Sequence, residues 1–541
     1  MPESQATADY YKFCPGEQHV RISNAICLGR RRTHYPKCHG CQFNDDEKTV
    51  AAPKPASSAV TEHKTNSLLL PTPPDRTLAA NAVSSLFRPF DVFGTVPEPL
   101  SRGAAWRIGH ATAQFLRSKL RGCDRADPSA RAIVVGRDPR EHSTMLEEAL
   151  IEGIRSTGTN VVSLGLVDAA QVYFAVNRLG ACGGVQITAG HRPIDQNGFQ
   201  ICGTRAAPIG VETGLISIRD IAMRIPEHQT GVHSRLLTKD LSEPYTQFIR
   251  EFLFAKSRLP HPVKIVVDAG NGSAGHWLPI VLKGIRNLRI VRLNFECRGE
   301  FAHEPNPMKL RNTRELRKIV KDEQADFGVC LDSSAERCVF TDDKGRTCRP
   351  EFLGTLLARL FIEREPGATI IYDHRSSAVT EEEIVRAGGV AVRERIGGDY
   401  VKRAMAERNA VFGCDLSGRF YFRDNYYCES GILAMVQVIN LLLSTRRDLS
   451  ELIRPLQRYS SSGDVSFTCD DTDMALHQIV QAHGSATVEQ FDGVTFRYPD
   501  WWFNVRPFAS QRLVHVTLEA RSRKIVDQKL TELQPLLGER T

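Results

Sequence analysis

The chain lacks the features that would place it in a membrane or send it out of the cell. Its first residues, Met-Pro-Glu-Ser-Gln-Ala-Thr-Ala-Asp, contain no basic stretch followed by an apolar core, so they do not resemble a secretory signal. Its longest largely apolar run, residues 431–443, contains Gln437 and Asn440 and is shorter than the ~20 residues that a membrane span needs. We therefore predict a cytoplasmic protein without membrane contact, in which this run forms a buried helix.

A large excess of one charge is also absent. The chain has 70 Lys and Arg against 63 Asp and Glu, a net charge of +7 over 541 residues. This excess weakly favours an anionic partner, either a sugar phosphate or a nucleic acid. A hydrophobic content of 41% with 25% charged residues is typical of soluble globular proteins, and the length indicates several domains.

Cysteines are numerous but show no disulfide framework over most of the chain. Of the 14, ten are scattered from Cys123 to Cys469, which favours reduced, buried thiols. The other four lie in the first 50 residues with twelve, ten and two residues between them: Cys14, Cys27, Cys38 and Cys41. About 50 residues bury too little apolar surface to fold well unaided, so we predict that residues 1–50 form a zinc module with these four ligands. The alternative is a tail with unliganded thiols.

Two further hypotheses concern this amino-terminal module. Arg30, Arg31 and Arg32 invite a third overall interpretation, a nucleic-acid-associated protein. However, residues 1–50 hold seven basic and six acidic side chains, and this net charge of +1 argues against phosphate-backbone binding. We expect the module to contact a protein partner instead, and the Pro- and Ser-rich residues 51–79 to be a linker.

From about residue 80 the chain alternates short β-branched runs with helical patterns. Residues 132–136, 263–268 and 368–373 each read as a buried strand that opens such a unit. Residues 493–498 and 513–518 alternate apolar and polar side chains instead, as strands of a sheet with one exposed face do. The pattern predicts consecutive α/β layers followed by an α+β terminal domain.

Several ordered motifs carry a resemblance to a known family. Residues 187–199 read Ile-Thr-Ala-Gly-His-Arg-Pro-Ile-Asp-Gln-Asn-Gly-Phe. They resemble the active-site loop of the α-D-phosphohexomutases, Thr-Ala-Ser-His-Asn-Pro followed by Asn-Gly-Phe-Lys. Residues 87–94, 135–140, 268–272 and 492–506 are similar to four further family signatures, in the family's order.

The resemblance implies four domains around an active-site cleft. We place three α/β domains at residues 80–240, 241–345 and 346–455, and an α+β domain at 456–541. In the family, a loop serine passes its phosphoryl group to the sugar and takes the other phosphate back, with Mg²⁺, a proton shuttle and a phosphate grip.

The resemblance places a glycine where the family has its nucleophile. Gly190 stands at the serine, Arg192 at the asparagine and Gln200 at the lysine. Loss of a covalent nucleophile typically costs about 10⁴ to 10⁶ in rate. The adjacent His191 is the alternative phosphoryl carrier, but we expect it only to brace the loop.

The metal loop resembles the family's Asp-Gly-Asp-Gly-Asp-Arg and reads Asp-Ser-Ser-Ala-Glu-Arg at residues 332–337. The resemblance assigns Asp332, Ser334 and Glu336 to the metal. A serine replaces one carboxylate and a glutamate changes the reach of another, so we expect weak or absent Mg²⁺ binding, because Mg²⁺ demands near-octahedral geometry.

The sugar-reading and phosphate-gripping loops depart as well. Gly398 stands at the family's candidate proton-shuttle histidine, and Lys402 is retained as the remaining acid/base candidate. The resemblance assigns the ligand to Asp415, Ser417, Arg419, Arg506, Ser510 and Arg512. Phe508 and Ala509 replace two polar residues of the phosphate grip.

These departures lead to one prediction and its rival. We predict a catalytically inactive phosphohexomutase homologue that binds a sugar phosphate or another anion and acts through binding or regulation. The rival is an active mutase, interconverting hexose 1- and 6-phosphates by a route without serine.

Overall fold

The structure is a computed structural model that describes residues 11–13, 21–23, 81–120, 132–226, 234–508 and 512–541. The chain divides into two compact units, Met1–Pro73 and Pro74–Thr541. In the first unit, strand β1 (Tyr11–Phe13) pairs with β2 (Arg21–Ser23) in antiparallel fashion. The expected zinc ligands Cys14, Cys27, Cys38 and Cys41 and the linker 51–79 lie outside the described residues, so the zinc module stays a prediction.

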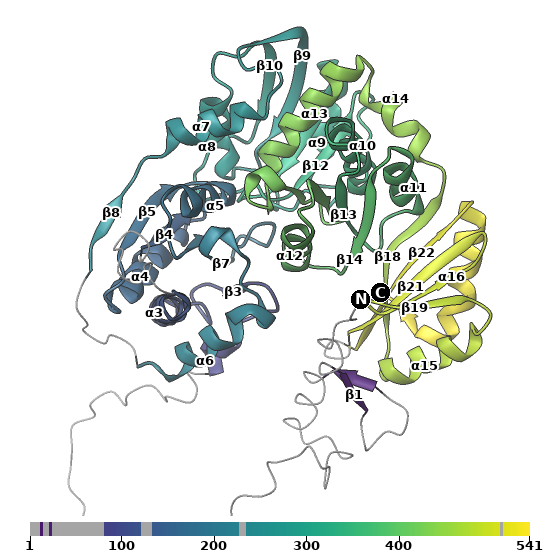
Figure 1. Ribbon diagram of the computed structural model, residues 1–541, viewed down its shortest axis with the longest axis horizontal. Helices are drawn as coiled ribbons and strands as arrows, with labels where there is room; N and C mark the ends of the chain where they lie inside the picture. Colours follow the sequence, from purple (N-terminus) through teal and green to yellow (C-terminus); the bar gives the residue numbers. More distant parts are fainter. Residues whose placement is uncertain (1–10, 14–20, 24–80, 121–131, 227–233, 509–511) are drawn as a thin grey trace, which may run out of the picture. The chain divides into compact units, whose positions relative to one another are not determined.

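The second unit begins with a six-stranded mixed sheet of order β3-β7-β6-β4-β5-β8 (Figure 1). Its strands are β3 (Val92–Thr95), β4 (Ile133–Arg137), β5 (Val161–Leu166), β6 (Gly183–Ile187), β7 (Gln196–Gly203) and β8 (Leu236–Thr238). Its helices are α3 (Arg102–Lys119), α4 (Ser143–Arg155), α5 (Ala169–Arg178) and α6 (Ile216–Arg224). Ile133 and Val135 pack in one core with α3 and α4, whereas Val134 packs in another with α5. Burial on both faces explains the continuous apolar run of β4.

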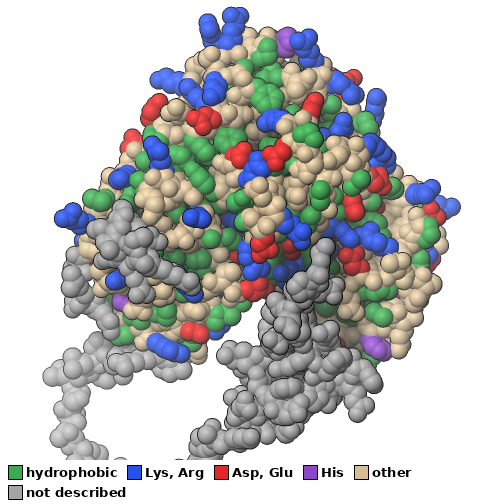
Figure 2. Space-filling view, viewed as in Figure 1, with side chains coloured by type: hydrophobic (Ala, Val, Ile, Leu, Met, Phe, Trp, Pro, Cys, Tyr) green, Lys and Arg blue, Asp and Glu red, His purple; other side chains and the backbone are tan. Residues whose placement is uncertain are grey.

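The second sheet has the order β10-β9-β11-β12. It consists of β9 (Arg258–Asp268), β10 (Arg286–Leu293), β11 (Phe327–Leu331) and β12 (Cys338–Asp342), accompanied by α7 (Ser242–Glu251), α8 (Ser273–Val281) and α9 (Arg314–Asp322). β10 forms an open edge and carries the exposed Arg286, Arg289 and Arg292. Figure 2 shows Lys and Arg side chains gathered at the top of the view, over β9 and β10. Charged side chains on an edge strand discourage pairing with another chain.

The third sheet has the order β14-β13-β15-β16-β17. It consists of β13 (Thr369–Asp373), β14 (Val390–Glu394), β15 (Phe412–Cys414), β16 (Phe420–Phe422) and β17 (Cys428–Glu429). Its helices are α10 (Pro350–Arg364), α11 (Ala378–Arg386), α12 (Gly398–Arg408), α13 (Gly431–Thr445) and α14 (Leu449–Ile453). α13 contains the apolar run 431–443 and is buried along most of its length, which confirms the predicted buried helix.

The last sheet is antiparallel, with the order β19-β20-β21-β22-β18-β23. It consists of β18 (Ser460–Thr468), β19 (Thr487–Gln490), β20 (Val494–Arg497), β21 (Trp501–Phe508), β22 (Leu513–Ala520) and β23 (Glu539–Arg540). Helices α15 (Thr472–Ala482) and α16 (Arg523–Leu537) pack against it (yellow in Figure 1). Three α/β layers and a terminal α+β layer confirm the predicted fold class.

The first three layers of the second unit share one large apolar cluster, whereas the last layer does not. One apolar cluster runs without a break through the first three layers and includes Val172, Val267, Leu331, Ile370 and Ile439. The last layer has a core of its own. The nine cysteines of the described ranges are free, and seven are buried. Across those same ranges, no helix combines the length and the apolarity that a bilayer crossing requires.

Candidate functional site

The loop between β6 and β7 presents Gly190 to the loop that follows β11. Gly190 is buried and has a φ of +54°, in the left-handed region. A Cβ atom at this position would lie 3.3 Å from Asp332 Oδ2, 3.7 Å from Ser334 Oγ and 3.8 Å from Glu336 Oε2. Position 190 therefore faces the predicted metal ligands, but it carries no side chain that could hold a phosphoryl group.

A buried arginine holds this loop in place. Arg140 donates to four carbonyl oxygens, those of Gly190 (2.8 Å), Arg192 (2.8 Å), Pro193 (2.7 Å) and Gln196 (3.1 Å). Its Nε donates at 3.2 Å to Asp138, which also accepts from the hydroxyls of Ser143, Thr188 and Ser333. The loop backbone is thus fixed by groups that do not depend on the residue at position 190.

The predicted metal loop keeps two carboxylates in a buried setting. Asp332 Oδ1 accepts the backbone N–H groups of Glu336 (2.9 Å) and Arg337 (3.2 Å). Glu336 Oε2 accepts from Gln200 Nε2 (2.8 Å) and Ser334 Oγ (3.0 Å). The remaining oxygens, Asp332 Oδ2 and Glu336 Oε1, are buried and find no hydrogen-bond partner in the described part of the chain.

Burial changes the protonation of both carboxyls. It raises the pKa of Glu336 to about 8, with a further contribution from the charge of Glu429. Burial also raises the pKa of Asp332, although Arg337 opposes the shift. Two buried carboxyls with one free oxygen each are suited to a cation, but Ser334 supplies no charge, and the cation must displace the proton of Glu336.

Beside these loops lies a cavity of about 210 Å³. Its lining contains five cationic side chains, namely Arg192, Arg337, Arg375, Lys402 and Arg419, and six acidic ones, namely Asp91, Glu336, Asp373, Asp399, Asp415 and Glu429. Burial raises the pKa of Asp399 to about 7, against the opposing charge of Lys402. Because Glu336 and Asp399 hold protons for much of the time near neutral pH, the lining favours an anion more than its formal charges indicate.

Lys402 is committed to an ion pair inside this cavity. Its Nζ lies 2.7 Å from Glu429 Oε2 and 3.5 Å from the Tyr173 hydroxyl, and the side chain is buried. Burial lowers the pKa of Lys402, but Glu429 outweighs it and raises the pKa above its ordinary value. A lysine held this firmly in its charged form is a poor proton shuttle.

The predicted sugar-binding side chains of the loop at residues 414–419 also form hydrogen bonds and ion pairs within the protein. Asp415 Oδ1 accepts from the backbone N–H (2.8 Å) and hydroxyl (2.6 Å) of Ser417, and Oδ2 accepts from Tyr421 Oη (2.9 Å). Arg419 lies 3.9 Å from Glu429 and lines the cavity. At the family's histidine position, a Cβ on Gly398 would meet Tyr421 Oη at 3.1 Å, so the tyrosine hydroxyl stands close to that place.

The two described residues of the expected phosphate grip, Arg506 and Arg512, have different ion-pair partners. Arg506 Nη2 lies 3.9 Å from Asp464 and Nη1 lies 3.7 Å from Asp492, and the guanidinium stacks over Phe508. The Arg512 side chain is 74% exposed and lies 3.5 Å from Asp470, and neither Arg506 nor Arg512 belongs to the cavity lining. Ser510 falls outside the described residues.

Arg375 lines the cavity and connects it to this region, because it donates to both Asp373 and Asp464.

His191 and Arg192 complete the surroundings of Gly190. Burial, followed by the charges of Arg337 and Arg419, lowers the pKa of His191 to about 2, so the imidazole is neutral. Arg192 stacks on Phe93, with its guanidinium carbon 3.3 Å from the ring centroid. Both side chains border the small space in front of Gly190.

Six charged residues that line the cavity were not selected from the sequence: Asp91, Arg337, Asp373, Arg375, Asp399 and Glu429. Arg337 ends the recognised metal motif and could have been included on that ground. Asp399 lies next to Gly398. Glu429 ends the short strand β17, Arg375 follows β13, and neither carries a motif of its own, so only the fold reveals them.

Comparisons with known proteins agree with this geometry. The alpha/beta/alpha domains I, II and III of phosphoglucomutase/phosphomannomutase match residues 84–227, 243–345 and 349–459. The chain is 32% identical over 461 residues to phosphohexose mutases of Xanthomonas campestris pv. campestris, covering 83% of this chain and 98% of the relative. It is 29% identical to the phosphomannomutase of Escherichia coli K12, covering 84% and 99%.

A solved structure supports the same assignment. The phosphoglucomutase/phosphomannomutase family protein from Burkholderia thailandensis aligns with a TM-score of 0.75 and 25% identity, covering 84% of this chain and 97% of that one. The order of the three domains, the placement of the loops and the extent of the similarity establish one conclusion. This chain belongs to the phosphoglucomutase/phosphomannomutase family of phosphohexomutases.

Proposed function

We propose that this family member binds a hexose phosphate or a related anion in the 210 Å³ cavity without converting it, and acts through binding or regulation. The observation that carries the proposal is Gly190, a residue without a side chain at the point where the loop faces Asp332, Ser334 and Glu336. Covalent phosphoryl transfer needs an oxygen or nitrogen nucleophile there.

The neighbouring groups support loss of turnover. Lys402, which lines the cavity, forms an ion pair with Glu429. Gly398, at the position of the family's histidine, has no side chain that could transfer a proton. Mutase chemistry requires the protein to donate one phosphoryl group to the sugar and to accept the other phosphate back, so a missing nucleophile and a missing proton shuttle affect both transfers. Binding requires only the cations, and Arg192, Arg337 and Arg419 remain in the lining.

Magnesium binding is expected to be weak. Asp332 and Glu336 would hold the ion through their unpartnered oxygens, and the ion would supply charge neutralisation for a bound phosphate. Because Mg²⁺ must displace the proton of Glu336, whose pKa lies at about 8, we expect its affinity to rise from pH 6 to pH 9.

The first test is a coupled mutase assay with glucose 1-phosphate and mannose 1-phosphate, Mg²⁺ and the matching 1,6-bisphosphate. The Arg506→Ala variant, purified in parallel, reveals contaminating enzyme. We expect the parent chain and this variant to show the same background rate. A rate in the parent that the variant abolishes would overturn the proposal and establish the serine-independent rival, with His191 or a diffusible bisphosphate as phosphoryl source.

Binding is tested separately by isothermal titration with the same sugar phosphates and with inorganic phosphate. We expect Arg419→Met to weaken binding at least tenfold, because its side chain, 15% exposed, borders the cavity. Arg298→Met, which removes an exposed arginine paired with Glu296, is the matched control and should leave binding unchanged. If the parent chain binds none of these compounds, the proposal that the cavity holds a hexose phosphate or a related anion is wrong.

A further inference from the structure

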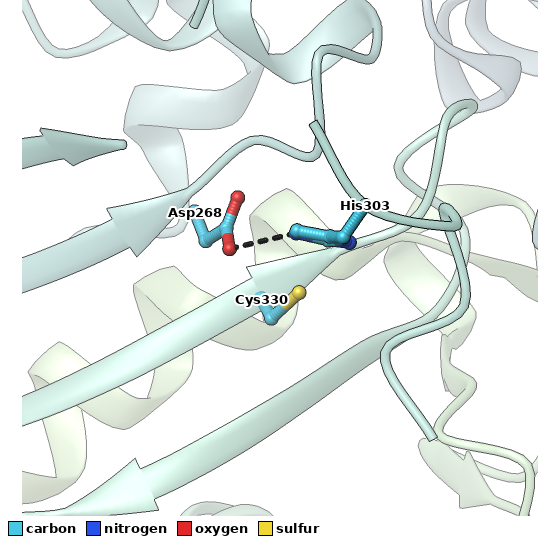
Figure 3. A group of neighbouring side chains, drawn as sticks. All are labelled: Asp268, His303 and Cys330. Atoms are coloured by element: carbon cyan, nitrogen blue, oxygen red, sulfur yellow. Dashed lines mark hydrogen bonds and ion pairs between the residues drawn. The ribbon is translucent and has the colours of Figure 1, made fainter. Parts of the chain in front are cut away.

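A group of donor side chains outside the cavity lies at the carboxyl edge of the second sheet. Asp268 ends β9, and Cys330 is its register partner on the parallel neighbour β11. His303 reaches them from the segment that follows β10 (Figure 3). One ligand atom of each residue lies within 4.8 Å of the other two, and His303 Nε2 is 2.9 Å from Asp268 Oδ2.

Hydrogen bonds to neighbouring groups hold His303 and Asp268 so that one atom of each, Nε2 and Oδ2, faces the other. His303 Nδ1 lies 2.8 Å from the carbonyl oxygen of Glu304, which only accepts, so Nδ1 carries a proton and Nε2 faces the cluster. Asp268 Oδ1 accepts from the N–H of Gly270 (3.0 Å) and from Asn294 Nδ2 (2.9 Å), which leaves Oδ2 for the cluster. Backbone carbonyls and amides hold metal-ligating histidines and carboxylates in this manner.

An ion pair between protonated His303 and Asp268 accounts for two of the three residues. It does not account for Cys330, whose sulfur lies at the long distance of 4.0 Å from the carbonyl oxygen of Leu331. Cys330 is fully buried, Asp268 is 1% exposed, and the His303 side chain is 17% exposed, so the cluster is reachable from one side.

We propose that Asp268, His303 and Cys330 bind one Zn²⁺ ion, with water in the fourth position. A thiolate, an imidazole and a carboxylate suit zinc, whereas Mg²⁺ prefers oxygen ligands alone. On binding, the Cys330 sulfur forms the bond to zinc and its proton leaves to solvent. The ion would bridge β9, β11 and the segment that carries His303, and its three ligands are distinct from Asp332, Ser334 and Glu336 of the neighbouring loop.

The test measures zinc by mass spectrometry in the full chain after incubation with Zn²⁺ and desalting. Any zinc in residues 1–50 contributes equally to every variant, so differences between variants report this site. Cys330→Ala and His303→Gln should each contain about one zinc ion fewer per chain than the parent. Cys338→Ala is the matched control, because Cys338 is equally buried on the adjacent strand β12 and outside the cluster.

A second measurement covers the case in which Cys330→Ala does not fold. Cobalt replaces zinc in the parent and in His303→Gln, and the thiolate-to-cobalt absorption is compared with that of the Cys338→Ala variant. Reduced absorption in His303→Gln alone supports the site. Equal zinc content and equal absorption in His303→Gln, Cys338→Ala and the parent would overturn the proposal and leave Asp268 and His303 as an ion pair.

Discussion

Two loops that face each other are built in opposite ways. The loop around Gly190 is held by Arg140 and Asp138, whose hydrogen bonds to the backbone and to neighbouring hydroxyls are complete. The loop at residues 332–337 leaves one buried carboxylate oxygen of Asp332 and one of Glu336 without partners among the residues described. The first arrangement stabilises a backbone shape. The second costs free energy unless a cation or a proton occupies it.

The difference separates what folding needs from what chemistry needs. Groups that fix the loop backbone can remain while the group that would react is replaced, because neither depends on the other. A buried carboxyl without a partner destabilises the fold, so its presence indicates either a bound ion or a proton. Four substitutions test this contrast, from the largest expected effect to the smallest.

Removal of Arg140 should affect stability most. Arg140→Ala leaves Asp138 buried without its cation and four carbonyls without their donor. We expect a loss on the order of 5 kcal/mol, enough to unfold the first layer. Urea denaturation followed by tryptophan fluorescence measures it, with the exposed Arg102→Ala as control. A loss below about 1 kcal/mol would show that the loop does not rely on Arg140.

Breaking the ion pair in the cavity should cost about 3 kcal/mol. Lys402→Met leaves Glu429 charged and buried, whereas the double variant Lys402→Met/Glu429→Gln should recover most of the loss. Lys318→Met, which removes an exposed partner of Asp322, should cost less than about 1 kcal/mol. If the double variant is as unstable as the single one, the unpaired charge is not the cause.

The pH dependence of stability should report Glu336. Its pKa of about 8 lies above the ordinary 4.5, so between these values the folded chain holds a proton that the unfolded chain has lost. The contribution of this proton to the free energy of unfolding is therefore fully present below pH 4.5 and is lost as the pH rises through 8. Glu336→Gln should gain melting temperature relative to the parent as the pH rises from 5 to 8, in the presence of a chelator.

The exposed Glu407→Gln is the control for this pH series and should follow the parent. A constant difference between Glu336→Gln and the parent across the range would mean that Glu336 is already ionised at low pH.

Restoring a side chain at position 190 should have the smallest effect on stability. Gly190→Ser places a Cβ at φ +54° and 3.3 Å from Asp332, and we expect a loss of about 1 to 2 kcal/mol. Gly158→Ser measures the share of this stability loss that comes from the backbone conformation alone, because Gly158 has φ +78° and a Cβ there would meet no atom within 4 Å. We also expect no mutase activity in Gly190→Ser, since Lys402 stays paired. Activity in this variant would show that the nucleophile alone was missing.

The sequence was sufficient to predict the fold class and the family, because three central strands, residues 132–136, 263–268 and 368–373, are recognisable apolar runs and the motifs occur in order. It could not foresee that Lys402 is neutralised by Glu429, because the two residues are brought together by the packing of α12 on the third sheet. The assignment of Arg506 and Arg512 to one anion stays a prediction; Arg506 lies near Asp464 and Asp492, whereas Arg512 lies near Asp470.

The continuous apolar cluster through the first three layers bears on how the cavity could be altered. Since the shape of the lining loops comes from Arg140, Asp138 and that shared interior, cavity-facing side chains other than the Lys402–Glu429 pair can be exchanged in sets. A library randomised at Arg192, Ser417 and Arg419 would sample new ligand preferences on an unchanged frame, which makes the molecule a starting point for engineered sugar-phosphate sensors.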